Sequence, residues 1–220
     1  MGRIKLKAGA LTAPLPPVLV TVGDMEKSNI ITIGWTGILS TSPARTYVSV
    51  RPERYSHKLL SEGGEFVINL TTAAMAKKVD YCGIYTGAKV DKFEKCGFNK
   101  VASNEVAPPT IAECPLSLEC RVIEVLNYGT HDVFLADIVS VSADEGMLDE
   151  QGRLRFDRAD LLAYAHGEYF ALGKSLGKFG FSATKKPKKP TRPGTKPQSK
   201  SAKPKSEHPK AKGAKKGDKR

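Results

Sequence analysis

The densest group of polar side chains in the sequence lies at residues 51–57, between a strand-like segment and a helix-like segment. Arg51 and Arg54 bring two guanidinium groups, and Ser56 brings a hydroxyl able to cap the helix. The first N–H groups of a helix have no partner inside the helix, so with the arginines they form a cradle for an anion such as phosphate. The alternative is a solvated loop in which the arginines pair with Glu53 or with other surface acids.

The single tryptophan of the chain, Trp35, offers a flat surface for stacking. It lies between Gly34 and the nearby Gly37, and glycines let another plane approach the backbone closely. The alternative is an ordinary core tryptophan.

Four cysteines are spread over residues 82–120 without a CxxC pair and without a histidine at zinc-ligand spacing. We therefore predict buried free thiols, and no metal site. The common motifs of dinucleotide, P-loop, hydrolase and zinc-protease sites, which are GxGxxG, GxxxxGK[ST], GxSxG and HExxH, do not occur where those folds need them.

The elements that position these residues are mostly strands. Hydrophobic runs and alternation predict strands at residues 18–23, 30–35, 45–51, 65–70, 116–126 and 131–142. Residues 37–44 have loop composition, residues 55–62 and 73–85 favour helices, and Asp91 opens a short helical turn. Two hairpins and only short helices favour an antiparallel barrel over a doubly wound sheet.

Charge divides the chain into two parts. From Ala183 onward there are thirteen lysines and two arginines against Glu207 and Asp218, a net charge of +13, which leaves −1 for residues 1–182 of a chain whose total is +12. Residues 183–220 contain no Val, Ile, Leu, Met or aromatic residue, so we predict a disordered basic tail after a folded domain at 1–182. Such a tail could bind acidic surfaces or nucleic acid without specificity.

No apolar run approaches the length of a membrane span, and the N-terminal segment is broken by Pro14, Pro16 and Pro17 before it could form a signal-peptide core. We therefore expect a cytoplasmic protein that does not contact a membrane.

Four segments in order resemble the flavin reductase-like family, its flavoredoxin branch most closely. They are NIITIGWTGILSTSPARTYVSVRPERYSHKLLSEGGEFVINL at 29–70, VDKF at 90–93, YGTHDVFLADIVSV at 128–141 and YAHGEYFALGKSLGKFGFS at 164–182. The resemblance implies a mainly β, Greek-key split barrel with short peripheral helices that binds FMN noncovalently, as a homodimer with flavin sites near the subunit interface.

The same resemblance assigns site residues. Along the isoalloxazine ring and ribityl chain it implies Asn29, Trp35, Thr36, Gly37 and Ser40. Around the phosphate it implies Ser49, Val50, Arg51, Arg54, Tyr55 and Ser56. Lys92 is expected to project toward the cofactor as a mobile point charge, with Tyr164 near the edge of the cofactor. His131 resembles a residue on the nicotinamide side, or is an ordinary surface histidine.

Three functions follow as hypotheses. The first is an oxidoreductase in which FMN accepts hydride from NADH or NADPH and passes electrons to a flavin, a metal complex or a protein, with no side chain assigned as a catalytic acid or base. The second is an FMN electron carrier with little NAD(P)H activity. The third is a nucleic-acid-binding protein that acts through its tail.

Overall fold

The computed structural model describes residues 2–183, and the chain divides into two units, residues 1–176 and 177–220. The first unit holds the main sheet and its helices. Within the second, the described residues contain one short helical turn, η4 (Phe181–Ala183). Apart from Ala183, the tail predicted at 183–220 lies outside the described residues.

Strands dominate the first unit. They are β1 (Val18–Gly23), β2 (Ser28–Ile33), β3 (Thr36–Thr41), β4 (Ala44–Val50), β5 (Glu65–Asn69), β6 (Lys100–Val101), β7 (Thr110–Ile111), β8 (Leu116–Asn127), β9 (Asp132–Ala143), β10 (Leu162–Ala165) and β11 (Glu168–Ala171). The helical elements are α1 (Tyr55–Gly63), η1 (Ala73–Met75), α2 (Ala76–Ile84), α3 (Lys92–Cys96), η2 (Glu145–Met147) and η3 (Phe156–Arg158). No helix within residues 2–183 is long and apolar enough to cross a membrane.

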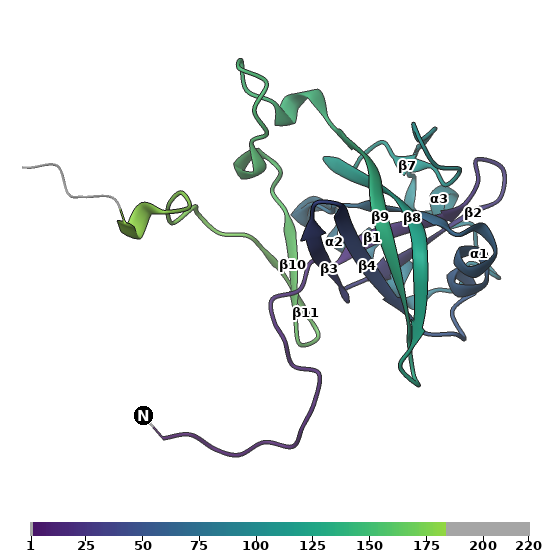
Figure 1. Ribbon diagram of the computed structural model, residues 1–220, viewed down its shortest axis with the longest axis horizontal. Coiled ribbons are helices and arrows are strands. Elements are labelled where there is room, and N and C mark those ends of the chain that lie inside the picture. The colour runs from purple at the N-terminus through teal and green to yellow at the C-terminus, as the bar shows by residue number, and fades with distance from the viewer. Residues whose placement is uncertain (1, 184–220) are drawn as a thin grey trace, which may run out of the picture. The chain divides into compact units, whose positions relative to one another are not determined.

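Seven strands form one antiparallel sheet in the order β2-β1-β5-β8-β9-β4-β3, which Figure 1 shows with the long β8–β9 hairpin across its front. Two small hairpins, β10–β11 and β6–β7, stand apart from this sheet. The prediction of a mainly β, antiparallel fold with short helices is confirmed. The β10–β11 hairpin was not predicted, because its four-residue strands are too short to show clear alternation.

The first hairpin depends on one glycine. Asp24 closes the turn between β1 and β2 by accepting hydrogen bonds from the N–H groups of Glu26 and Lys27. Gly23 has a φ of 91°, and a Cβ at this position would lie only 2.0 Å from the carbonyl oxygen of Lys27. Any other residue would therefore open the turn.

The loop prediction at residues 37–44 was wrong, because most of this segment belongs to β3. Its backbone pairs with β4 from Thr36 opposite Val48 to Thr41 opposite Ala44. β3 is an edge strand of the sheet and none of its residues is buried, so the segment lacks the alternation that a half-buried strand shows.

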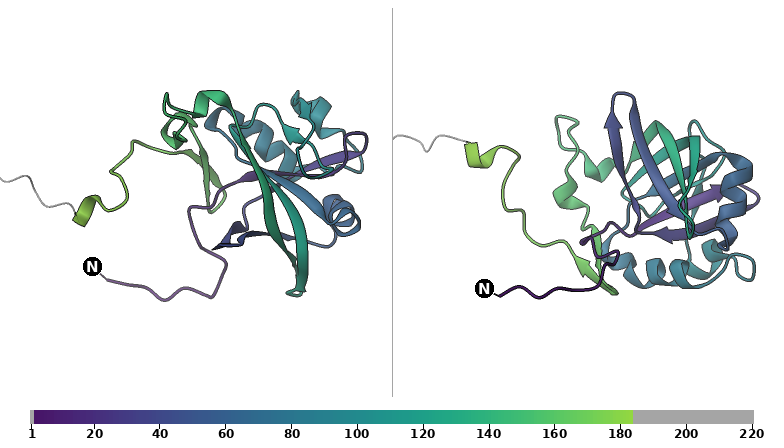
Figure 2. Two further views of the ribbon diagram at one scale, coloured as in Figure 1. Left: turned by 45° about the horizontal axis from the view of Figure 1, so that its top comes forward. Right: turned by 60° about the horizontal axis from the view of Figure 1, so that its bottom comes forward.

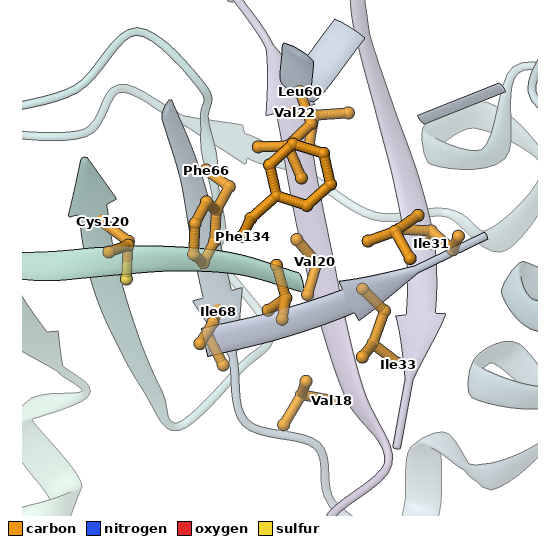
Figure 3. Packing of buried hydrophobic residues seen from close by; sticks show 13 residues of the cluster. Val18, Val20, Val22, Ile31, Ile33, Leu60, Phe66, Ile68, Cys120 and Phe134 are labelled. Atoms are coloured by element: carbon orange, nitrogen blue, oxygen red, sulfur yellow. The ribbon is translucent and has the colours of Figure 1, made fainter. Parts of the chain in front are cut away.

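One hydrophobic core fills the inside of the curled sheet. Figure 3 shows side chains from β1, β2, β5, β8 and β9 pointing toward one another, with Leu60 of α1 among them. Thr46, Val48 and Val50 are all buried on one face of β4, as their alternation predicts. Strand β2, at one end of the sheet order, and β4, next to the other end, both contribute to this core, so the sheet is curled into a barrel.

A second core lies on the outer side of β1, where α2 and α3 pack. Leu19 of β1 contacts a cluster that includes Val79 of α2 and Phe93 of α3. Strand β1 is thus buried on both faces, and Figure 2 shows the helices on the outside of the curled sheet. This packing places the ends of α2 and α3 beside β2, where the candidate site lies.

Candidate functional site

Two adjoining cavities lie beside β2, and both are lined by Ile31 and Arg54. The first, here called the strand cavity, has a volume of about 250 Å³ and is lined mainly by strand residues, with Trp35, His131 and Tyr164 on its walls. The second, the helix cavity, has a volume of about 290 Å³ and lies among the ends of α1, α2 and α3. The two cavities therefore share part of their walls.

Trp35 forms an aromatic wall of the strand cavity together with His131. The two ring centroids lie 4.5 Å apart, with 38° between the ring planes. Trp35 is 43% exposed, so the alternative of a core tryptophan is wrong. Burial and the charge of Arg51 lower the pKa of His131, so its imidazole is mostly neutral at pH 7.

The β10–β11 hairpin also lines the strand cavity, through Tyr164 and Tyr169. Tyr164 exchanges two backbone hydrogen bonds with Leu15, of 2.8 and 2.9 Å, which fasten the N-terminal segment to this hairpin. The ring of Tyr164 meets the ring of Tyr169 edge-on, with 5.2 Å between centroids. Burial, and then the nearby Asp80 carboxylate, raise the pKa of Tyr169 to about 12, so this hydroxyl stays protonated.

A partly buried contact between His57 and Asp132 joins α1 to β9. Nε2 of His57, in α1, lies 2.7 Å from Oδ2 of Asp132, the residue next to His131. Hydrogen bonds from His57 and Asn127 lower the pKa of the Asp132 carboxyl. This contact holds the first turn of α1 beside the start of β9.

The two arginines of the predicted anion cradle differ in their surroundings. Nη2 of Arg51 lies 2.6 Å from Oε1 of Glu53, and both side chains are more than half exposed. The solvated alternative thus describes Arg51. Arg54 has no carboxylate partner within residues 2–183, and its Nη1 donates a hydrogen bond to the Gly83 carbonyl oxygen at 3.3 Å. Arg54, at the N-terminus of a helix without acidic residues in its first turn, is the stronger anion donor.

Ser56 does not cap α1, so that expectation was wrong. Arg54 occupies the capping position, and Ser56 is the second residue of the helix. Its buried hydroxyl oxygen accepts a hydrogen bond of 2.7 Å from Nδ2 of Asn29. This bond ties β2 to α1 across the helix cavity.

Lys92 is a fixed charge, which corrects the expectation of a mobile one. Its side chain is 3% exposed, and its Nζ donates to the carbonyl oxygens of Ile30 at 2.7 Å and Cys82 at 2.8 Å. Asp91 caps α3 and so anchors the backbone of its neighbour. Burial, more than any other cause, lowers the pKa of Lys92 to about 8.

Sequence analysis missed the loop after α2, which closes the helix cavity through Thr86 and Gly87. A Cβ on Gly87 would lie 2.2 Å from Oδ1 of Asn29, so only glycine allows this close approach. Nothing in the sequence distinguishes this glycine from any other that follows a helix.

Ten of the thirteen predicted site residues line these two cavities: Asn29, Trp35, Ser49, Val50, Arg51, Arg54, Tyr55, Ser56, Lys92 and Tyr164. The other three lie on β3. Thr36 lines a neighbouring cavity and donates a hydrogen bond to the Tyr47 carbonyl oxygen, Gly37 packs on the Tyr47 ring, and Ser40 donates to the Pro43 carbonyl oxygen.

The four cysteines are free and buried, as predicted. Sγ of Cys82, on the wall of the helix cavity, lies 3.8 Å from Sγ of Cys96. Burial raises the pKa of Cys82 to about 12, so this thiol is protonated and a poor nucleophile at neutral pH.

The chain belongs to the flavin reductase-like family, because the family model "Flavin reductase like domain" matches residues 11–173. Its structure is similar to that of flavoredoxin from Desulfovibrio vulgaris (Miyazaki F), with 30% identity and a TM-score of 0.77 over 83% of this chain and 100% of the other. An FMN-binding protein from Thermus thermophilus, solved with 1-cyclohex-2-enone, gives 27% identity and a TM-score of 0.68 over 80% of this chain and 99% of its own.

A relative with a stated activity is the NADH-dependent FAD reductase of Streptomyces globisporus. It is 26% identical over 157 residues, which cover 70% of this chain and 85% of the relative. The predicted family and the split-barrel fold are thus confirmed.

Proposed function

We propose that this chain is an FMN-binding oxidoreductase that takes hydride from NADH or NADPH and passes electrons to a flavin, a metal complex or a protein. The observation that carries the proposal is the junction of the two cavities at Ile31 and Arg54. The strand cavity has aromatic walls, and the helix cavity holds the buried ammonium of Lys92.

The aromatic and cationic groups of the two cavities suit FMN, which joins a flat ring to a phosphate through a ribityl chain. The strand cavity offers aromatic walls at Trp35 and Tyr164. The helix cavity offers the Arg54 guanidinium, the first N–H groups of α1 and the Lys92 ammonium. Family membership supports a flavin, and the named Thermus thermophilus and Streptomyces globisporus proteins support FMN and NADH respectively.

Bound FMN would supply hydride acceptance and electron transfer, and the chain would supply binding and orientation. Arg54 and the α1 N-terminus would hold the phosphate. Trp35 and Tyr164 would confine the ring and keep water from it. No side chain is assigned to proton transfer.

The likeness to flavoredoxin favours a second candidate, an FMN electron carrier with little activity toward NAD(P)H. Anaerobic mixing of the flavin-loaded chain with NADH or NADPH distinguishes the two. The oxidoreductase proposal expects rapid bleaching of the flavin absorption band with at least one of the two nucleotides. A band that persists with both nucleotides, but is bleached by dithionite, would support the carrier instead.

We further propose that the chain acts as a homodimer. Exposed apolar side chains follow one another near the end of the first unit, at Phe170, Leu172 and Leu176, and an apolar patch of this kind is typical of a subunit interface. Light scattering should give about twice the chain mass of 23.8 kDa. A monomer that still binds FMN would contradict this arrangement.

A further inference from the structure

Tyr85, the residue that follows α2, places an aromatic ring on the wall of the helix cavity. It lines this cavity together with Arg54 and Gly87, and half of its surface is exposed. The role proposed above for the helix cavity gives this ring nothing to do, because FMN ends at its phosphate.

The ring of Tyr85 is held in place from one side. It stacks on the ring of Tyr81, with 4.2 Å between the centroids and 27° between the planes. The N–H of Tyr85 donates to the Tyr81 carbonyl oxygen, and Tyr81 itself packs against the buried cluster between β1 and the helices. Tyr85 is therefore a preorganised flat surface, which loses little conformational freedom when a ligand binds.

The position of this surface matters more than its exposure. The anion donors Arg54 and the start of α1 line the same cavity as Tyr85. A dinucleotide continues past that first phosphate through a second phosphate and a ribose to an adenine. The adenine has a π-face that stacks on aromatic side chains, a contact worth about 1–3 kcal/mol per base.

We propose that Tyr85 stacks on the adenine ring of an adenosine diphosphate group, contributed either by FAD in the flavin site or by NAD(P)H. The inference rests on the proposed function, which provides the position of the phosphate. It adds a ligand group, and a residue that selects for it, outside the FMN footprint.

The first experiment measures dissociation constants of FMN and FAD for the full chain, with its flavin removed, by quenching of flavin fluorescence. If FAD brings the adenine, Tyr85→Ala should weaken FAD binding by about five- to hundredfold and leave FMN binding within about twofold. Tyr85→Phe keeps the ring and should bind FAD as the wild type does. Phe156→Ala, which removes an aromatic side chain of similar exposure outside the helix cavity, should leave both constants unchanged.

The second experiment distinguishes the source of the adenine. ADP-ribose is titrated calorimetrically into the FMN-loaded chain, so that only a nicotinamide-nucleotide subsite remains to be filled. If NAD(P)H brings the adenine, Tyr85→Ala should weaken ADP-ribose binding by about five- to hundredfold, which is the contribution of one stacked base. The ratio of the FAD and FMN dissociation constants should then stay unchanged.

The inference is overturned if Tyr85→Ala changes neither the FAD-to-FMN ratio nor ADP-ribose binding. It is also overturned if FMN and FAD weaken equally, because Tyr85 would then support the cavity rather than an adenine. Failure of the wild-type chain to bind any flavin would instead refute the proposed function itself.

Discussion

The two cavities of the site are built in different ways. The strand cavity is made by side chains of a sheet, and its walls at Trp35 and Tyr164 are partly exposed. The helix cavity is made where helix ends and a glycine loop approach β2, and its base holds the buried ammonium of Lys92. Both cavities are lined by Arg54, but only the helix cavity contains a buried charge, at Lys92, so substitutions should cost more in the helix cavity.

The largest effect is expected at Lys92 and appears as a pH dependence. Its folded-state pKa of about 8 lies below the ordinary value of 10.5, so between these pH values the unfolded chain holds a proton that the folded chain has lost. The free energy of unfolding attributable to Lys92 should therefore rise with pH, by up to about 1.4 kcal/mol per unit above pH 8.

Comparison with Lys92→Met isolates this contribution, because the buried thiols act in the opposite direction. Cys82 and Cys120 have pKa values raised to about 12, and such thiols lower stability as the pH rises past 9. In urea unfolding at pH 7.5, 8.5 and 9.5, the free energy of unfolding of the wild type should rise steadily relative to that of Lys92→Met. Parallel profiles for the two proteins would mean that Lys92 keeps its proton in the folded state.

Arg54→Ala comes next in size. Loss of a charge-assisted contact to phosphate costs about 1.5–3 kcal/mol, so FMN affinity should fall by roughly ten- to hundredfold. Arg51→Ala is the matched control, and its exposed pair with Glu53 predicts a change below about fivefold. Binding of lumiflavin, which lacks the phosphate, should be indifferent to both substitutions. A larger loss for Arg51→Ala than for Arg54→Ala would mean that Arg51 makes the main contact with the phosphate.

Trp35→Ala tests the strand cavity and should have a smaller effect. An aromatic contact adds about 0.5–1.5 kcal/mol, or two- to twelvefold in affinity, beyond the area that it buries. FMN and lumiflavin should weaken by the same factor, because the ring is common to both. A loss confined to FMN would show that Trp35 acts through the phosphate end.

The smallest effect is expected from truncation after Ser182. A segment without large apolar residues cannot shape a dry cavity, so FMN affinity should stay within about twofold. We propose that the tail binds nucleic acid or other acidic surfaces without specificity, and truncation should abolish any salt-sensitive binding of this kind. Release of FMN from the truncated chain would show that the tail contributes to flavin binding.

Sequence patterns predicted the strand cavity better than the helix cavity. Alternation at residues 45–51 and the run at 18–23 follow directly from one-sided or complete burial of strands, which is a local property. The edge strand β3 was missed because its outward side chains never meet a core. Exposure of Trp35 depends on what packs beside it, and no local pattern contains that information.

The helix cavity depends on contacts between segments far apart in the chain. Lys92 becomes fixed only because Ile30 and Cys82 bring carbonyl oxygens to its ammonium. Arg51 and Arg54 look equivalent in the sequence, and only the fold pairs one of them with Glu53 and directs the other to Gly83. Family resemblance pointed to most of these residues, but their roles follow from the three-dimensional structure.

The central claim is that one ligand fills both cavities, with its ring in the strand cavity and its phosphate in the helix cavity. The most direct test is titration of the flavin-free chain with FMN and with riboflavin, which differ only in the phosphate, followed by flavin fluorescence. FMN should bind about ten- to hundredfold more tightly than riboflavin, as a charge-assisted phosphate contact implies. Equal affinities, or no quenching by either flavin, would contradict the account.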